Sequence, residues 1–268
     1  METKGSKAYL FSIVAVAVIG GLLFGYDTAV ISGAEKGLQA FFMGADFEYT
    51  DAMHGITSSR ALLGCIIGSA ISGLLASTLG RKRSLFVAGA LFFLSALGSY
   101  YPEFLIFEPG VASYPLLIAF NLYRILGGIG VGLASAICPM YIAEIAPSNM
   151  RGKLVSWNQF AIIFGQLVVY FVNFLILGSH ANPIVELVDG VNTILNPEAA
   201  SWTIESGWRL MFVSEALPAG LFTLLILFVP ETPRFLAMTG RDGEALSVLS
   251  RINGSLRAQA ILSERDMA

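Results

Sequence analysis

Three charged residues interrupt long apolar stretches of this sequence: Asp27, Arg124 and Glu215. An ionised side chain within hydrocarbon costs roughly 2.5–3.5 kcal/mol on insertion scales, so each marks a candidate functional site. Together, two carboxylates and one guanidinium carry one surplus negative charge, and protonation of either acid removes it. These residue types therefore predict a site that takes up and releases a proton.

The three residues are expected to meet at one depth of a membrane. With a rise of 1.5 Å per helical residue and alternating helix directions, Asp27, Arg124 and Glu215 all fall in the outer half. A static buried salt bridge between Asp27 and Arg124 stays open as an alternative. Glu215 is supported less strongly, because a structural role explains it equally well.

Composition indicates an integral membrane protein. Hydrophobic residues make up 55% of the 268 residues and charged residues 13%, against about 25% charged residues in soluble domains. The basic residues lie in short segments between apolar stretches, which argues against a nucleic-acid partner. Neither His54 nor His180 has metal-ligand spacing to a partner, and no Gly-rich phosphate loop is present. We therefore expect no enzymatic activity, no cofactor and no metal.

Six segments are long and apolar enough to span a bilayer, since about 20 residues cross a hydrocarbon core of about 30 Å. They are Tyr9–Gly33, His54–Leu79, Ser84–Tyr100, Tyr114–Ala143, Leu154–Leu177 and Trp208–Val229. Residues 178–207 are rich in turn-forming Asn and Pro, and are expected to form a solvated loop. Residues 241–252 have apolar side chains on one face and are expected to form a short surface helix.

Lysine and arginine are concentrated between alternate segments. The loops after the second and fourth segments carry Arg81, Lys82, Arg83, Arg151 and Lys153, whereas the loops on the opposite side carry acids and little besides Lys36. By the positive-inside rule, both termini are expected in the cytoplasm.

Several short motifs are spaced along the whole chain. They are Gly-Gly-Leu-Leu-Phe-Gly-Tyr-Asp-Thr-Ala-Val-Ile-Ser-Gly (20–33), Gly-Arg-Lys-Arg (80–83), Tyr-Arg-Ile-Leu-Gly-Gly-Ile-Gly-Val-Gly (123–132), Tyr-Ile-Ala-Glu-Ile-Ala-Pro (141–147), Arg-Gly-Lys (151–153) and Pro-Glu-Thr-Pro-Arg (230–234). In this order and spacing they resemble the sugar porter family of the major facilitator superfamily. Residues 152–166 look most like those of bacterial D-xylose:proton symporters.

The resemblance implies an all-α membrane protein with six transmembrane helices in a 3+3 inverted repeat, the N-terminal half of a twelve-helix major facilitator fold. Residues 1–229 would form the six-helix bundle, and residues 230–268 a cytoplasmic segment that begins the interdomain linker. The C-terminal six-helix half is missing, and with it the second wall of the substrate site. The implied function is proton-coupled symport of a monosaccharide, D-xylose by the local match, across the cytoplasmic (inner) membrane by alternating access.

The resemblance also assigns roles to individual residues. Asp27 and Arg124 match the proton-coupling pair, and uncoupled facilitators of the family have asparagine at the position of Asp27. Phe24, Gln159 and Gln166 match residues that contact the sugar. Another set matches the cytoplasmic ion pairs that gate the transporter: Arg81, Arg83, Glu144, Arg151, Glu231 and Arg234.

In the fifth segment Gln159, Gln166 and Asn173 recur every seven residues and so share one helix face. Their amides both donate and accept hydrogen bonds, as sugar hydroxyl groups require. They could instead join helices, through membrane hydrogen bonds worth about 0.6 kcal/mol each.

Two other functions stay open. An uncoupled sugar facilitator is disfavoured by Asp27, because facilitators of the family have asparagine there. A non-transporting membrane sugar sensor is disfavoured by the short tail after the sixth segment, because sensors typically have long cytoplasmic tails.

The sequence departs from the superfamily pattern in one motif. The pattern usually has an aspartate just before the Gly-Arg of the loop after the second segment, whereas residues 76–79 are Ala-Ser-Thr-Leu.

Overall fold

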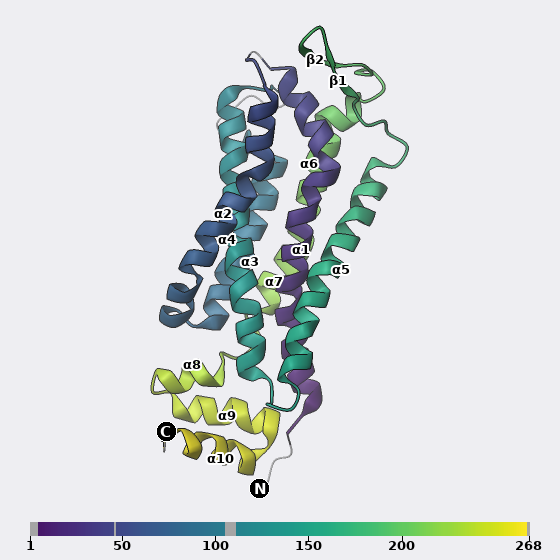
Figure 1. Ribbon diagram of the computed structural model, residues 1–268. Helices are drawn as coiled ribbons and strands as arrows, with labels where there is room; N and C mark the ends of the chain where they lie inside the picture. The colour runs from purple at the N-terminus through teal and green to yellow at the C-terminus, as the bar shows by residue number, and fades with distance from the viewer. Residues whose placement is uncertain (1–4, 46, 105–110, 267–268) are drawn as a thin grey trace.

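Six helices cross the length of the bundle in a computed structural model that describes residues 5–45, 47–104 and 111–266 (Figure 1). Within these residues six segments are long and apolar enough to span a membrane. Five are single helices: α1 (Lys7–Met43), α2 (Asp51–Thr78), α3 (Arg81–Tyr100), α4 (Tyr114–Ile145) and α5 (Arg151–Leu177). The sixth, Thr203–Leu225, consists of a π-turn η1 (Thr203–Gly207), α6 (Trp208–Val213) and α7 (Ala216–Leu225). The six predicted segments are therefore confirmed as helices.

The first helix continues ten residues past Gly33, where the predicted segment ends. It begins after Ser6, whose hydroxyl accepts the backbone N–H of Tyr9 at 3.2 Å as an N-cap. It continues to Met43 because residues 34–43 place their apolar side chains on one buried face, with Leu38 fully buried. Apolar spacing at helical period extends a helix beyond the hydrocarbon when a neighbouring element covers that face.

The sixth helix is broken, whereas the sequence predicted one continuous span over Trp208–Val229. The break lies at Ser214 and Glu215, between α6 and α7. Pro218 explains it, because proline has no N–H to donate to the carbonyl of Ser214 and its ring crowds that carbonyl. The helical part also begins earlier, at Thr203, and ends at Leu225.

The two contacts between the three-helix repeats are alike, as expected for a 3+3 inverted repeat. The middle helix of each repeat packs along the first helix of the other: α2 along α4, and α5 along α1. Both contacts are made through glycines: a Cβ atom at Gly64 or Gly128 would lie 2.2 or 2.0 Å from a carbonyl oxygen of the partner helix. At Gly165 and Gly25 the corresponding distances are 2.2 and 1.9 Å. Small residues at these crossings let the backbones touch, which is a common packing device in lipid.

Three short helices lie at the end of the bundle that also carries both termini (Figure 1). They are α8 (Pro233–Met238), α9 (Asp242–Asn253) and α10 (Ser255–Asp266). The predicted surface helix corresponds to α9, which buries Ala245, Leu249 and Ile252 as expected. The N-terminal segment joins this layer, since the backbone N–H of Ser6 donates to the carbonyl of Arg251 at 2.8 Å.

At the opposite end, the loop predicted only as a solvated segment contains a β-hairpin. Strand β1 (Val185–Val188) pairs antiparallel with β2 (Val191–Ile194). Asp189 and Gly190 form the turn, with φ of 52° and 82°. Two positive φ angles are typical of the tight turns that Asp-Gly favours between strands.

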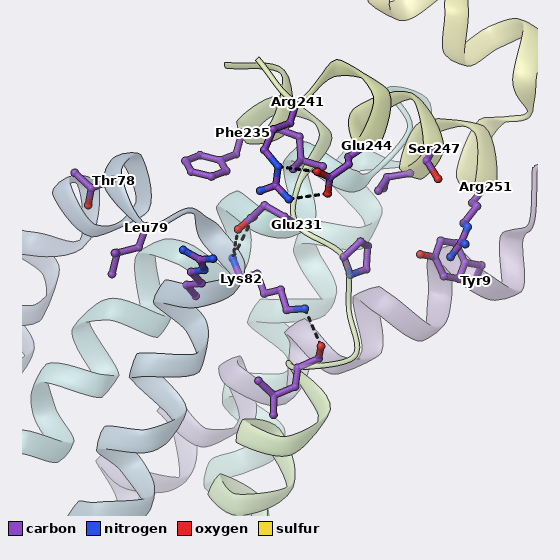
Figure 2. A pocket seen from close by; sticks show the side chains of 15 residues that line it. Tyr9, Thr78, Leu79, Lys82, Glu231, Phe235, Arg241, Glu244, Ser247 and Arg251 are labelled. Atoms are coloured by element: carbon purple, nitrogen blue, oxygen red, sulfur yellow. Dashed lines mark hydrogen bonds and ion pairs between the residues drawn. The ribbon is translucent and has the colours of Figure 1, made fainter. Parts of the chain in front are cut away.

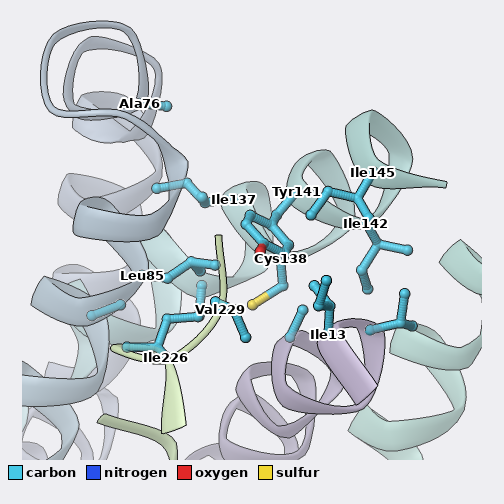
Figure 3. Packing of buried hydrophobic residues seen from close by; sticks show 14 of the residues in the cluster. Ile13, Ala76, Leu85, Ile137, Cys138, Tyr141, Ile142, Ile145, Ile226 and Val229 are labelled. Atoms are coloured by element: carbon cyan, nitrogen blue, oxygen red, sulfur yellow. The ribbon is translucent and has the colours of Figure 1, made fainter. Parts of the chain in front are cut away.

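The apolar core near the termini joins α1, α3, α4 and α7 (Figure 3). Ile13, Leu85, Cys138, Tyr141 and Ile226 are buried in it. Tyr141 donates its hydroxyl proton to the carbonyl of Pro230 at 2.7 Å, which satisfies its polar end. This contact ties the chain after the sixth helix to α4.

The glycine contact between α1 and α5 makes a testable prediction. In Gly25→Ala the new Cβ would lie 1.9 Å from the carbonyl oxygen of Ile162, so we expect the free energy of unfolding to fall by about 1–3 kcal/mol through overpacking. The matched control is Gly73→Ala in α2, where a Cβ meets nothing within 4 Å and alanine favours the helix. Thermal unfolding in detergent measures both. Equal melting temperatures for the two variants would contradict the close approach.

Candidate functional site

Asp27 of α1 and Arg124 of α4 form an ion pair inside the bundle. Arg124 Nη1 donates to Asp27 Oδ1 at 2.7 Å, and their side chains are 5% and 1% exposed. The guanidinium carbon also lies 5.0 Å from the centre of the Phe212 ring. A charge-assisted hydrogen bond and an aromatic face together hold Arg124 where water cannot reach it.

Glu215 completes the group, because the break in the sixth helix places it beside this pair. It is 1% exposed and interacts electrostatically with both Asp27 and Arg124. The break is tied to α1 by a hydrogen bond of 2.7 Å between the hydroxyl groups of Tyr26 and Ser214. The three residues that the sequence expected at one depth are thus brought together.

The carboxylate oxygens of this group are only partly satisfied. Among the described residues Asp27 Oδ2 and both oxygens of Glu215 are buried without a hydrogen-bond partner. An unpaired buried acceptor is costly, and two carboxylates beside one guanidinium leave a surplus negative charge. A proton would give the group a donor and neutralise it at once.

Gly127 of α4 leaves space beside the Asp27 carboxylate because it has no side chain. A Cβ atom at Gly127 would lie 2.4 Å from Ser95 Oγ and 3.7 Å from Asp27 Oδ1. Gly127 therefore allows α3 and α1 to approach α4 next to the carboxylate. The hydroxyl of Ser95 is itself buried without a partner among the described residues.

The predicted sugar contacts lie on an open side of the bundle. Gln159 is exposed, whereas Phe24 and Gln166 are half-buried. Neither glutamine side chain has a hydrogen-bond partner within the part of the chain that the structure describes, so their amides are available to a ligand. The structure leaves the sugar-binding role of these three residues a prediction.

Asn173 joins two helices, which was the alternative to binding the sugar. It is buried, and its Nδ2 donates to the carbonyl of Val30 in α1 at 3.2 Å. The seven-residue spacing shifts by about 20° per repeat on a helix of 3.6 residues per turn, so Asn173 turns toward α1 while Gln159 does not. Asn158 was missed by the spacing argument: it is 5% exposed and packs against the backbone at Gly21, with Oδ1 unpaired among the described residues.

Near the termini a second charged cluster joins α3, α4 and the chain after the sixth helix. Arg81 Nη2 donates to Glu144 at 2.8 Å, and its Nη1 donates to the carbonyl of Ala76 at 3.2 Å. The other oxygen of Glu144 accepts the hydroxyl of Thr232 at 2.6 Å. The cluster therefore joins α3 and α4 to the end of α2 and to the chain after the sixth helix.

Glu231 holds the first turn of α3, which has no side-chain cap of its own. Its carboxylate accepts the backbone N–H groups of Arg81 and Lys82, each at 3.1 Å. A negative group at a helix N-terminus is favoured by the exposed N–H groups and the helix dipole. Burial raises the pKa of Glu231, and these backbone hydrogen bonds oppose that rise.

Three other predicted gating residues, Arg83, Arg151 and Arg234, are exposed. In the described parts of the chain none of them forms an ion pair. Their gating role stays a prediction.

At the hairpin end the structure contains charged contacts that sequence reasoning missed. Arg209 pairs with Glu103 through two hydrogen bonds, 2.8 Å from Nη1 and 2.5 Å from Nη2, and both residues are buried. Its guanidinium lies 5.0 Å from the Phe41 ring centre and 4.6 Å from that of Trp208. The signals available in the sequence were a basic residue at the start of the sixth predicted segment and an acid in the loop after the third, on the same side of the membrane.

A second contact at this end joins α1 to the start of α2. His54 lies between Glu35, 3.3 Å from Nε2, and the hydroxyl of Tyr49, 3.2 Å from Nδ1. Burial raises the pKa of Tyr49 to about 12. Within the described residues no group of histidine, cysteine and acidic side chains could hold a metal ion.

Comparison with known proteins agrees with this geometry. A family profile described as "Sugar (and other) transporter" matches residues 13–267. The chain is 44% identical over 274 residues to the D-xylose-proton symporter of Escherichia coli (strain K12), covering 98% of this chain and 52% of that protein. It is 33% identical over 255 residues to the glucose facilitated diffusion protein of Zymomonas mobilis, covering 94% of this chain and 49% of that protein.

A solved structure shares the fold. It is that of the proton:xylose symporter XylE of the major facilitator superfamily bound to 6-bromo-6-deoxy-D-glucose, with a TM-score of 0.86 and 44% identity over 96% of this chain and 52% of that one. The chain thus spans about half the length of the curated relatives it matches. Its six helices correspond to about half of a major facilitator transporter, and the family is one of transporters, not of enzymes. The chain is a multi-pass membrane protein that belongs to the sugar porter family.

Proposed function

We propose that this chain is the N-terminal half of a proton-coupled monosaccharide symporter with D-xylose as its sugar. The observation that carries the proposal is the buried group of Asp27, Arg124 and Glu215, in which two acids face one base. A facilitator has no need of a titratable acid in this position. The 44% identity to a D-xylose-proton symporter supports both the coupling and the sugar.

The proton acts by changing the partners of Arg124. With Asp27 ionised, the ion pair at 2.7 Å holds α1 against α4. Protonation of Asp27 weakens that attraction, and the protonated carboxyl group can then donate a hydrogen bond to the neighbouring carboxylate of Glu215 while keeping its proton. Arg124 is freed, so the contact between α1 and α4 can differ between the outward-open and inward-open states.

The sugar would bind beside this group, between the present half and a C-terminal half. Phe24 supplies an aromatic face, and Gln159 and Gln166 supply amides that donate to and accept from hydroxyl groups. Residues 1–229 form the transporting half in this proposal. Residues 230–268 form a cytoplasmic layer at the start of the linker to the second half.

The charged residues at the end that carries both termini indicate how the bundle is oriented in the membrane and which contacts would close its cytoplasmic side. The end that carries both termini also carries Arg81, Lys82, Arg83 and Arg151, so we assign it to the cytoplasm of a bacterial inner membrane. There the Arg81–Glu144 pair and the cap formed by Glu231 would close the cytoplasmic side. Arg83, Arg151 and Arg234 remain available for partners in the second half.

An uncoupled facilitator is the second candidate, because the chain is also 33% identical to a glucose facilitated diffusion protein. A non-transporting sugar sensor is the third. Uptake driven by a proton gradient separates all three, since a facilitator only equilibrates its sugar and a sensor moves none.

Proton coupling is tested by Asp27→Asn, assayed together with a complementary C-terminal half in proteoliposomes. We expect D-xylose accumulation driven by an imposed pH gradient to be lost, because asparagine cannot carry the proton, while exchange of labelled sugar at equal pH continues. Asp189→Asn in the hairpin turn is the matched control and should accumulate sugar as the unmodified protein does. Accumulation by Asp27→Asn would overturn the coupling assignment.

Charge balance in the buried group predicts opposite effects on stability. Arg124→Leu leaves two buried acids without a counter-charge and is expected to lower the free energy of unfolding by about 3–5 kcal/mol. Glu215→Gln removes the surplus negative charge and should leave stability unchanged or raise it, most clearly at alkaline pH. The control is Arg151→Leu, which changes an exposed arginine. Thermal unfolding of the four proteins from pH 6 to pH 9 measures the difference. A loss of stability in Glu215→Gln equal to that in Arg124→Leu would show that the three charges do not balance one another.

A further inference from the structure

Ser95 of α3 is a buried polar residue that the ion pair of Asp27 and Arg124 does not use. It is 1% exposed, and among the described residues its hydroxyl has no hydrogen-bond partner. Serines inside helices commonly donate to a carbonyl three or four residues earlier, as Ser72 and Ser135 do here at 2.7 and 2.9 Å. A buried hydroxyl without such a bond is costly, so its position calls for a reason.

The hydroxyl of Ser95 lies near the oxygen of Asp27 to which Arg124 donates. A Cβ atom on Gly127 of α4 would lie 2.4 Å from Ser95 Oγ and 3.7 Å from Asp27 Oδ1. Both oxygens therefore border the position that a side chain would take there. Asp27 Oδ1 accepts Nη1 of Arg124 at 2.7 Å. A guanidinium group and a hydroxyl group thus stand near the same carboxylate oxygen, and the guanidinium holds it in this structure.

Helix α3 is anchored at its start by contacts that do not involve Arg124. The carboxylate of Glu231 accepts the backbone N–H groups of the first turn, and Lys82 Nζ donates to the carbonyl of Leu227 at 2.7 Å (Figure 2). These bonds join α3 to the end of the sixth helix. Release of Arg124 therefore does not by itself carry Ser95 away, and the hydroxyl can still turn about its own side-chain torsion.

Protonation of Asp27 creates the need for such a donor. The proton can add to Oδ2, which has no partner among the described residues, while Oδ1 loses the guanidinium when Arg124 leaves. A buried oxygen that loses its donor is left unsatisfied unless another group replaces it. We propose that Ser95 is a positioning residue whose hydroxyl replaces Arg124 as the donor to Asp27 Oδ1 in the proton-loaded state. This inference rests on the proposed function and names the group that stabilises Asp27 after the arginine is released.

The transport role is tested by Ser95→Ala, which removes the hydroxyl and keeps the helix. Initial uptake of D-xylose is measured against pH in proteoliposomes that also contain a complementary C-terminal half. We expect the pH of half-maximal uptake to fall by about 0.5–1 pH unit, because the proton-loaded state has lost one hydrogen bond. Ser72→Ala in α2 is the matched control: Ser72 is also buried, but its hydroxyl is bonded within its own helix.

The contact between Ser95 and Asp27 is tested separately in the purified chain, without transport. In the unmodified chain the hydroxyl is unbonded, so Ser95→Ala should leave the melting temperature unchanged or raise it. In Arg124→Leu the hydroxyl takes the place of the missing guanidinium, so adding Ser95→Ala should lower the melting temperature by about 2–4 °C. Arg124→Leu/Glu215→Gln keeps the net charge of the buried group and serves as the background if Arg124→Leu does not fold.

The two measurements can fail independently. Equal changes in melting temperature from Ser95→Ala in both backgrounds overturn the proposal, whatever the uptake shows. An unchanged pH of half-maximal uptake, or the same fall in Ser72→Ala, overturns the role of Ser95 in the proton switch. Absence of proton-driven accumulation by the unmodified halves overturns the proposed function and the transport role of Ser95 with it, while the melting temperatures still decide the contact with Asp27.

Discussion

The ion pair between Asp27 and Arg124 is the interaction on which the rest of the structure depends. A charge at this depth is tolerated only if its partner lies within hydrogen-bond distance, so α1 and α4 must be held in register. Gly127 of α4 permits this approach, because a Cβ atom there would lie 2.4 Å from Ser95 Oγ of α3 and 3.7 Å from Asp27 Oδ1 of α1. Glycine packing and ion pairing are therefore parts of one arrangement.

Helix α4 connects the two charged clusters of the bundle. It carries Arg124 at the buried pair and Glu144 at the end near the termini, twenty residues and about 30 Å along one helix. Glu144 in turn binds Arg81 and Thr232, which belong to two other segments. In the proposed mechanism, a shift of α4 on release of Arg124 would also act on the contacts of Glu144, because both residues belong to this helix.

Much of the fold could be predicted from the sequence, because hydrocarbon imposes strict requirements on length and polarity. The six helices were found for this reason, and so was the meeting of Asp27, Arg124 and Glu215. The predictions failed outside the hydrocarbon, where water can satisfy the backbone, and where contact with a neighbouring element determines how far a helix extends. The extension of α1 past Gly33 depends on a buried face outside the hydrocarbon, and the Asp189–Gly190 turn was hidden among loop residues.

What the sequence by itself determined was the inventory: six spans, two buried acids, one buried base, and motifs shared with sugar porters. Tertiary structure alone decided which groups remain free to act. It turned Asn173 toward α1 as a link between helices, while Gln159 stayed open to a ligand. It also left three carboxylate oxygens of the buried group without partners among the described residues. The physical reason is that a residue's type sets which bonds it can form, whereas only packing decides which of those bonds are already made.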